Sequence, residues 1–183
     1  MANPAQSGIT VAIFASDKGP GDPERASLMG EVGRVFARKG AHMLCLAENG
    51  VIPVPLITAA RTAGGSVEVV ADASISLPPA LSGVPITALP VQAERQTYLA
   101  AKSAAFCVLP GSLASISSLF GAWASGASRP VVMLNRHRAF EVVRGFAADV
   151  MSASVPHHDR NIQFADTVED LWNKVVWVNE QRR

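Results

Sequence analysis

The sequence predicts an α/β fold: a three-layer αβα sandwich built on a mostly parallel sheet of about seven strands. One observation behind this is that short runs rich in valine, isoleucine and alanine alternate with longer segments that begin and end like helices. Another is that most of the short runs are continuously apolar, as strands are when helices cover both faces of their sheet. A length of 183 residues, without repeats or a low-complexity linker, indicates a single Rossmann-like domain, residues 1–183.

The strands and helices can be placed in order along the chain. The candidate strands are Ile9–Ala15, Ala41–Ala47, Val67–Ala71, Pro85–Leu89, Ala104–Leu109, Pro130–Leu134 and Asn161–Phe164. The first helix begins at Asp22, a cap followed by a first-turn proline, and ends at Gly40. The last begins near Thr167, which stands three residues before Asp170 as in a capping box. Four more helices are expected over about Val54–Ala63, Gln92–Ser103, Ala114–Ser125 and Arg138–Met151.

Composition excludes several classes of function. The net charge is +1 and there is no basic tract, which argues against an electrostatically driven nucleic-acid binder. No apolar run reaches the roughly 18 residues of a membrane-spanning helix, and the first ten residues do not resemble a signal peptide. Cys45 and Cys107 each lie in a strand-like apolar run, as buried and reduced thiols do. We therefore expect a cytoplasmic protein that binds neither nucleic acid nor membrane.

Ligands of doubly wound sheets bind beyond the carboxyl ends of the strands, so the strand-to-helix loops are the candidate sites. The loop after the first strand is glycine-rich and polar and leads into a helix; it begins with Ser16 and Asp17. It can offer backbone N–H groups and a hydroxyl to a nucleotide, or it is an ordinary capped turn. The loop after the second strand contains Asn49-Gly50, a natural turn pair, and by itself predicts only a loop.

The loop after the fifth strand is the best candidate for an anion site. Gly111 follows the strand, Ser112 and Ser115 bring hydroxyl groups, and a helix begins at Ala114. Small residues let an anion approach the free N–H groups of a helix start, where it gains about 0.3–2 kcal/mol from the helix dipole. The loop lacks the lysine of a P-loop and the spacing of G-x-G-x-x-G. The residues alone leave a phosphate cradle and a plain tight turn as equal alternatives.

A resemblance to a known family decides between them. Pro110-Gly111-Ser112-Leu113-Ala114-Ser115-Ile116-Ser117-Ser118, preceded by Glu94-Arg95-Gln96, resembles the P-G-G-x-G-T-x-x-E and E-R-K segments of the Lonely Guy phosphoribohydrolases. These proteins, formerly labelled lysine decarboxylases, are related to the molybdenum-cofactor carrier proteins. The resemblance extends over nearly the whole chain. It implies a Rossmann-like fold, a bound nucleotide or pterin-type cofactor, and a homodimer built partly on the helix that carries Leu119, Phe120 and Trp123.

The chain departs from this family at the residue on which catalysis depends. In the family, the glutamate of the motif and the arginine of E-R-K work together to cleave the bond between base and ribose. Arg95 is retained, but Ser118 occupies the glutamate position. A positioned general base is worth about 10²–10⁴ in rate, so its loss predicts crippled hydrolysis. Glu48 and Glu94 are the nearby candidates for a substitute carboxylate.

The sequence therefore predicts a nucleotide-binding protein that keeps the cradle and has lost hydrolytic catalysis. The predicted binding residues are Ser16, Asp17, Gly50, Arg95, Gly111, Ser112, Leu113, Ala114 and Ser115. No catalytic residue is assigned, no cofactor is required, and no metal is expected, because the adjacent His157 and His158 have no third ligand at a recognisable spacing. The alternatives are an active nucleoside 5'-monophosphate phosphoribohydrolase, a molybdenum-cofactor carrier protein, and a ligand-free structural module.

Overall fold

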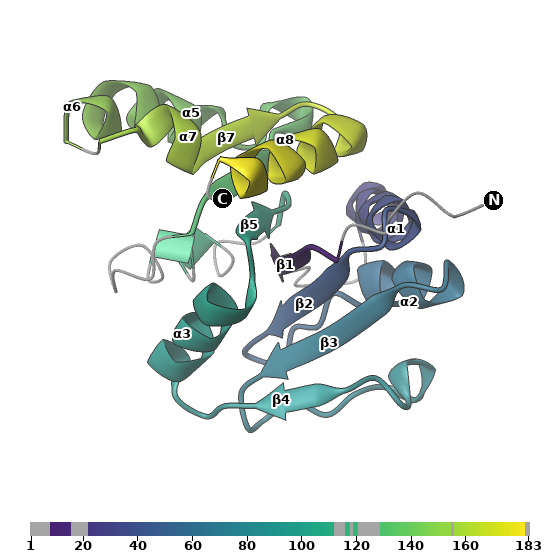
Figure 1. Cartoon of the computed structure of the whole chain (residues 1–183). Helices are drawn as coiled ribbons and strands as arrows, with labels where there is room; N and C mark the ends of the chain where they lie inside the picture. The colour runs from purple at the N-terminus through teal and green to yellow at the C-terminus, as the bar shows by residue number, and fades with distance from the viewer. Residues whose placement is uncertain are drawn as a thin grey trace.

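The computed structural model describes residues 8–15, 22–111, 116–117, 119–120, 129–154 and 156–181. Its strands are β1 (Thr10–Phe14), β2 (His42–Ala47), β3 (Ser66–Ala71), β4 (Ile86–Ala88), β5 (Ala105–Val108), β6 (Val131–Leu134) and β7 (Ile162–Ala165). They form one seven-stranded sheet in the order β4-β3-β2-β1-β5-β6-β7, and every neighbouring pair is parallel. Helices cover both faces (Figure 1), which confirms the predicted three-layer α/β fold.

Most helices begin and end where the sequence predicts. The longer ones are α1 (Pro23–Arg38), α2 (Val54–Thr62), α3 (Gln92–Lys102), α5 (Glu141–Phe146) and α8 (Val168–Glu180). The shorter ones are η1 (Pro79–Leu81), η2 (Arg136–Arg138), the π-helical η3 (Ala147–Met151), α6 (Ser152–Ser154) and α7 (His158–Asn161). The Asp22 carboxylate accepts the N–H of Glu24 at 3.0 Å, and the Thr167 hydroxyl accepts that of Asp170 at 3.1 Å. Residues 116, 117, 119 and 120 are helical, and the rest of the helix expected over Ala114–Ser125 lies outside the described residues.

The two faces of the sheet carry separate apolar layers. Helices α1, α2 and α8 pack on one face and α3 on the other (Figure 1). In the first layer Trp172 of α8 meets Phe36 of α1 edge to face, with ring centroids 5.1 Å apart. Helices α1 and α2 approach so closely that a Cβ at Gly33 would lie 2.3 Å from the carbonyl oxygen of Leu56. Within the described residues, no helix combines the length and apolar character needed to cross a membrane.

The two cysteines lie in one row across the sheet. Ile13 of β1 pairs with Cys45 on β2 and with Cys107 on β5. Two strand spacings separate the cysteines, about 9–10 Å, which is too far for a disulfide. Both thiols are free and buried, and burial raises the pKa of each well above its ordinary value. The prediction of buried, reduced thiols is confirmed.

The helix predicted over Arg138–Met151 begins later and is less regular. Residues 136–138 form a 3₁₀ turn in which His137 and Arg138 have φ of 54° and 60°, and α5 starts only at Glu141. The cause is the buried side chain of Asn135, whose Oδ1 accepts the N–H of Phe140 at 2.7 Å. Its Nδ2 donates to the Glu141 carboxylate at 3.0 Å, so the chain turns before it can become helical.

Candidate functional site

The strand order makes the carboxyl ends of β1, β2 and β5 the candidate site. The connections from β1 lead toward one edge of the sheet, through β2 to β4, and those from β5 lead toward the other, through β6 to β7. Doubly wound sheets take their ligands where the order reverses in this way. Cys45 and Cys107 lie level with each other, because both pair with Ile13. Glu48 comes three residues after Cys45, and Pro110 comes three residues after Cys107. The loops after β2 and β5 therefore leave the sheet at the same level, on either side of β1.

Part of the predicted site lies outside the described residues. These residues are Ser16, Asp17, Ser112, Leu113, Ala114, Ser115 and Ser118. The structure does describe Gly50, Arg95 and Gly111, each at the carboxyl edge of the sheet, together with the two candidate substitute carboxylates Glu48 and Glu94.

The loop after β2 is a tight, left-handed turn. Glu48 and Val51 form an antiparallel bridge in which the Val51 N–H donates to the Glu48 carbonyl at 3.0 Å. Between them, Asn49 and Gly50 have φ of 55° and 74°. This conformation suits asparagine and glycine and is costly for other side chains, which confirms the predicted turn pair. Gly50 thus has a conformational reason to be glycine, whatever it contacts.

Arg95 is buried and bound to protein acceptors. Its Nε donates to Oε1 of Glu48 at 2.9 Å, and the two side chains are only 7% and 9% exposed. One of its terminal nitrogens donates to the carbonyl groups of Leu89 at 2.6 Å and Pro90 at 2.9 Å. The side chain therefore ties the turn after β2 to the segment between β4 and α3. A contact between Arg95 and a phosphate stays a prediction, because these bonds already use two of its three nitrogens.

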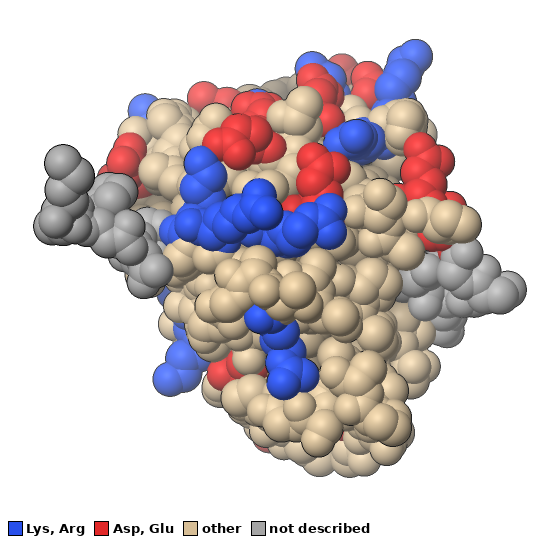
Figure 2. Space-filling view, turned by 90° about the vertical axis from the view of Figure 1, so that its right-hand side faces the viewer, with Lys and Arg blue, Asp and Glu red and all other residues tan. Residues whose placement is uncertain are grey.

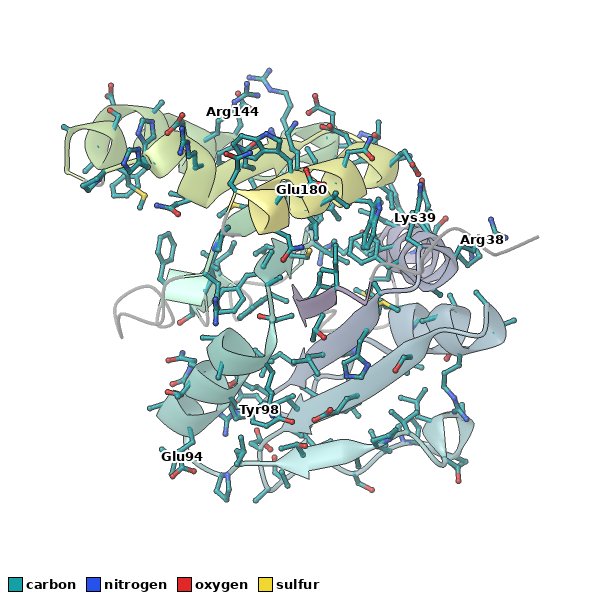
Figure 3. The ribbon with its side chains drawn as sticks, viewed as in Figure 1. Arg38, Lys39, Glu94, Tyr98, Arg144 and Glu180 are labelled. Carbon is teal, nitrogen blue, oxygen red and sulfur yellow. The ribbon has the colours of Figure 1, made fainter. Side chains whose placement is uncertain are left out.

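The structure also separates the two substitute carboxylates. Glu48 pairs with Arg95, whereas Glu94 is exposed at the beginning of α3 (Figure 3). Although Glu94 precedes Arg95 in the sequence, successive residues of a helix point about 100° apart. Of these two, only Glu48 completes an arginine–carboxylate pair.

Asp72 contacts the candidate site, and the sequence analysis did not identify it. It follows β3 directly, and its Oδ2 accepts the N–H of Asn49 at 2.9 Å. Its Oδ1 accepts the N–H and the hydroxyl of Ser74, at 2.9 and 2.5 Å. The hydrogen bond from the Ser74 hydroxyl, the two backbone N–H groups and the charge of Arg95 hold the pKa of Asp72 below its usual range, against partial burial. An acidic residue directly after a continuously apolar strand is the signal that could have identified it.

Together these contacts hold the turn after β2 from two sides. Asp72 holds it from the side of β3, and Arg95 holds it from the side of α3. Glu48 pairs with the Arg95 guanidinium, and the charge of Arg95 also acts on Asp72, so the charge of Arg95 is already matched. A phosphate bound here would depend mainly on backbone N–H donors at the helix start after β5. Within the described residues, no three His, Cys, Asp or Glu side chains are grouped to hold a metal ion.

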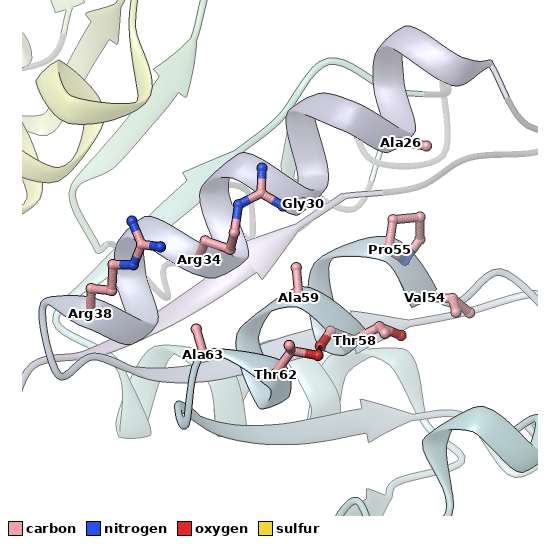
Figure 4. Close-up of a pocket in the computed structure, with 10 residues that line it drawn as sticks. All are labelled: Ala26, Gly30, Arg34, Arg38, Val54, Pro55, Thr58, Ala59, Thr62 and Ala63. Atoms are coloured by element: carbon pink, nitrogen blue, oxygen red, sulfur yellow. Dashed lines mark hydrogen bonds between the residues drawn. The ribbon is translucent and has the colours of Figure 1, made fainter.

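A separate groove lies between α1 and α2, on a helical layer and not at the strand ends. It encloses about 580 Å³ and is lined by Ala26, Gly30, Arg34, Arg38, Val54, Pro55, Thr58, Ala59, Thr62 and Ala63 (Figure 4). Lysine and arginine side chains gather in a band across this face (Figure 2). None of the predicted site residues lines the groove. It is not part of the candidate site.

Comparison with known proteins supports the fold and leaves the activity open. No protein-family model matches the chain, and no curated protein matches its sequence. The molybdenum cofactor carrier protein of Chlamydomonas reinhardtii superposes with a TM-score of 0.69 at 16% identity, over 93% of this chain and 98% of that one. The molybdenum cofactor binding protein of the phototrophic bacterium Rippkaea orientalis gives 0.66 at 13%, over 93% and 96%.

A third solved structure, the structural-genomics target TM1055, gives a TM-score of 0.67 at 22% identity, over 94% of this chain and 99% of that chain. These similarities run through almost the full length of every chain compared. They show that this chain has the fold of these three proteins.

Proposed function

We propose that this protein binds a phosphorylated, nucleotide-like cofactor over the carboxyl ends of β1, β2 and β5, and does not hydrolyse it. The observation that carries the proposal is that the turn after β2 and the segment after β5 leave the sheet at one level, at the point where the strand order reverses. Two structures that share the fold are named for carrying or binding the molybdenum cofactor, a pterin, which makes such a cofactor the first ligand to test.

In this proposal each loop has a different task. Backbone N–H groups from Gly111 to Ser115 hold the phosphate, and the hydroxyl groups of Ser112 and Ser115 add contacts. Ser16 and Asp17 approach the other end of the ligand. Arg95 acts chiefly by holding the turn at Gly50 in place, and its charge contributes less than the family resemblance implies, because Glu48 already neutralises it.

The absence of hydrolysis follows from the motif. Cleavage of a base from ribose needs a group that takes a proton from the attacking water, and Ser118 cannot do this as a carboxylate does. The protein would then keep its ligand intact, as a carrier or a sensor must. We further expect it to act as a homodimer in the cytoplasm.

One observation favours a second candidate, an active phosphoribohydrolase. Glu48 Oε1 lies 2.9 Å from Arg95 Nε, so an arginine–carboxylate pair exists at the carboxyl edge although the motif glutamate is missing. In this candidate Glu48 takes the proton from water, and Arg95 orients the carboxylate. The low exposure of both side chains, 7% and 9%, weighs against this role, because water must reach the carboxylate.

One experiment distinguishes these functions. Adenosine, guanosine and cytidine monophosphates and the isolated molybdenum cofactor, kept anaerobic, are titrated into the purified protein by calorimetry, while chromatography follows release of free base. We expect binding without base release. Ser115→Glu places a negative charge in the cradle and should weaken binding about tenfold or more. Ser82→Glu is the matched control, because Ser82 is exposed and precedes β4, at the opposite edge of the sheet.

Other outcomes assign the other functions. Base release that disappears in Glu48→Gln would establish the phosphoribohydrolase and its substitute carboxylate. If Ser115→Glu and Ser82→Glu weaken the binding of every ligand equally, the site lies outside the cradle. If none of the four ligands binds, the proposal fails and the structural module remains.

A further inference from the structure

The groove between α1 and α2, here called the α1–α2 groove, is lined by one row of residues from each helix (Figure 4). Residues four apart lie on the same side of a helix. The α1 row consists of residues at this spacing: Ala26, Gly30, Arg34 and Arg38. The facing row belongs to α2 and its C-terminal end: Val54, Pro55, Thr58, Ala59, Thr62 and Ala63. At about 1.5 Å per residue, the α1 row extends for about 18 Å along the helix.

A glycine keeps the floor of the α1–α2 groove open. A Cβ at Gly30 would lie 3.3 Å from Nη1 of Arg34 and 3.9 Å from Cβ of Ala59. Gly30 has no positive φ, so its backbone conformation does not require glycine. A longer side chain at this position would fill the groove and displace the Arg34 guanidinium. Gly30 therefore leaves a space that the charged end of Arg34 borders.

The two ends of the groove differ in chemistry. Ala26 and Pro55 lie toward one end and Arg38 at the other, with Arg34 between them (Figure 4). Among the described residues that line the groove none is acidic, and neither arginine forms an ion pair with another described residue. Lys39, next along α1, by contrast pairs with a carboxylate at 2.7 Å. The described part of the chain thus leaves the two arginine charges of the groove unmatched.

Two arginines on one side of a helix suit an anionic group. A guanidinium donates paired hydrogen bonds to a carboxylate or a phosphate. The negative end of a helix dipole acts within the last turn, and Arg34 precedes that turn, since α1 ends at Arg38. Small-molecule sites enclose about 300–1,000 Å³ and are mainly apolar, with a few polar groups that fix the orientation of the ligand. The groove, at about 580 Å³, has this size and this composition.

From these observations we propose that the α1–α2 groove binds an amphipathic anion, a molecule with one carboxylate or phosphate head and an apolar chain. The head lies between Arg34 and Arg38, and the chain runs past Gly30 toward Ala26 and Pro55. The distance from Arg34 to Ala26 is about 12 Å along the helix, which suits a chain of medium length such as that of decanoate. The groove shares no residue with the cofactor site proposed above, so the two proposals stand independently.

The test measures binding of decanoate and of decyl phosphate to the purified protein by calorimetry, below the concentration at which either forms micelles. We expect at least one of them to bind, with an affinity that falls as salt is added. The tighter of the two identifies the head group. Acetate has a head without the chain, and decyltrimethylammonium has the chain with the opposite charge, so neither should bind at the same concentration.

Two substitutions, each with a matched control, locate the site. Arg34→Gln should weaken binding about tenfold or more, because it removes a charged donor. Arg144→Gln, which changes an exposed arginine that points away from the body of the protein (Figure 3), should leave the affinity unchanged. Gly30→Leu fills the groove and should also weaken binding about tenfold or more. Gly145→Leu, in a helix but with open space at its Cβ, is its control.

Thermal unfolding shows whether each variant is folded, and Arg34→Gln alone decides the outcome if Gly30→Leu is not. The proposal is overturned if neither amphiphile binds, if decyltrimethylammonium binds equally well, or if Arg34→Gln and Arg144→Gln have equal effects. Undiminished binding in a folded Gly30→Leu protein would also overturn it. So would co-sedimentation with phosphatidylglycerol vesicles without binding of either free amphiphile, because this face would then contact a lipid surface.

Discussion

Helix α1 and the segment of residues 141–154 each contain a glycine within the helix, Gly33 and Gly145. The surroundings of these two glycines are opposite. Helix α1 buries Met29, Gly30, Val32, Gly33, Phe36 and Ala37 and has a side-chain cap at Asp22. Among residues 141–153 only Ala147 is buried, and this segment starts without a side-chain cap. Gly33 is needed because the α2 backbone lies against it, whereas Gly145 faces open space. Contacts within the chain explain the first glycine, whereas the second has no neighbour within 4 Å of its Cβ position that would require glycine.

The turn after β2 is also held by contacts within the chain, and we expect the largest loss of stability from a substitution there. Arg95→Leu removes the guanidinium that neutralises the buried Glu48 carboxylate. Breaking a buried ion pair in this way costs about 3–5 kcal/mol of unfolding free energy, measurable by urea denaturation. Lys174→Met, which breaks the more exposed pair with Asp170 at 2.8 Å, is the control, and it should cost about 0.5 kcal/mol or less. A loss below about 1 kcal/mol in Arg95→Leu would mean that the pair with Glu48 contributes little to stability.

Gly33→Ala tests the close approach of α1 and α2. The added methyl would lie 2.3 Å from the Leu56 carbonyl oxygen, so the two helices must move apart. We expect a loss of about 3 kcal/mol, near the upper end for overpacking, in the same urea experiment. An unchanged midpoint would show that the helices separate easily and would remove the contrast with Gly145.

Asp22→Ala tests the local signal that starts α1. The carboxylate accepts the N–H of Glu24 at 3.0 Å, so the substitution leaves that donor without its cap. The unfolding free energy should fall by about 1 kcal/mol. Asp22→Asn keeps an acceptor and should restore most of this loss; equal losses in both variants would point to the charge instead of the cap.

Gly145→Ala tests the second of the two glycines, which faces open space. Alanine at position 145 should raise the unfolding free energy by about 0.5–1 kcal/mol, because it restricts the unfolded chain and favours the helix. The measurement is urea denaturation of Gly145→Ala against the natural chain. Destabilisation would reveal a contact at Gly145 within the chain itself.

We expect the smallest effect in the pH dependence of stability. The lowered pKa of Asp72 means that its carboxylate stabilises the folded state at neutral pH. This contribution is fully present above the ordinary carboxyl pKa, about 4, and is lost as the pH falls through the lower folded value. Asp72→Asn should therefore lessen the loss of stability as the pH falls below about 4. Identical acid unfolding of both proteins would show that Asp72 does not contribute.

Local sequence determined most of the elements of this fold. All seven strands lie within a residue or two of the apolar runs that predicted them, and the caps at Asp22 and Thr167 are formed as expected. The turn at Asn49-Gly50 is also in place. These features depend on backbone conformation and on hydrogen bonds between residues close in sequence, so a short window of residues contains the necessary information.

Tertiary structure alone decided the partners of the site residues and the exposure of the helices. Arg95 meets Glu48, a residue 47 positions away, because β2 and the start of α3 come together at one edge of the sheet. No local pattern could show that this arginine would be neutralised, or that Asp72 would hold the turn. The spacing of Val142, Phe146 and Val150 resembles that of any core-facing helix. Which side of a helix is covered depends on packing between distant segments, and here the chain leaves that side open.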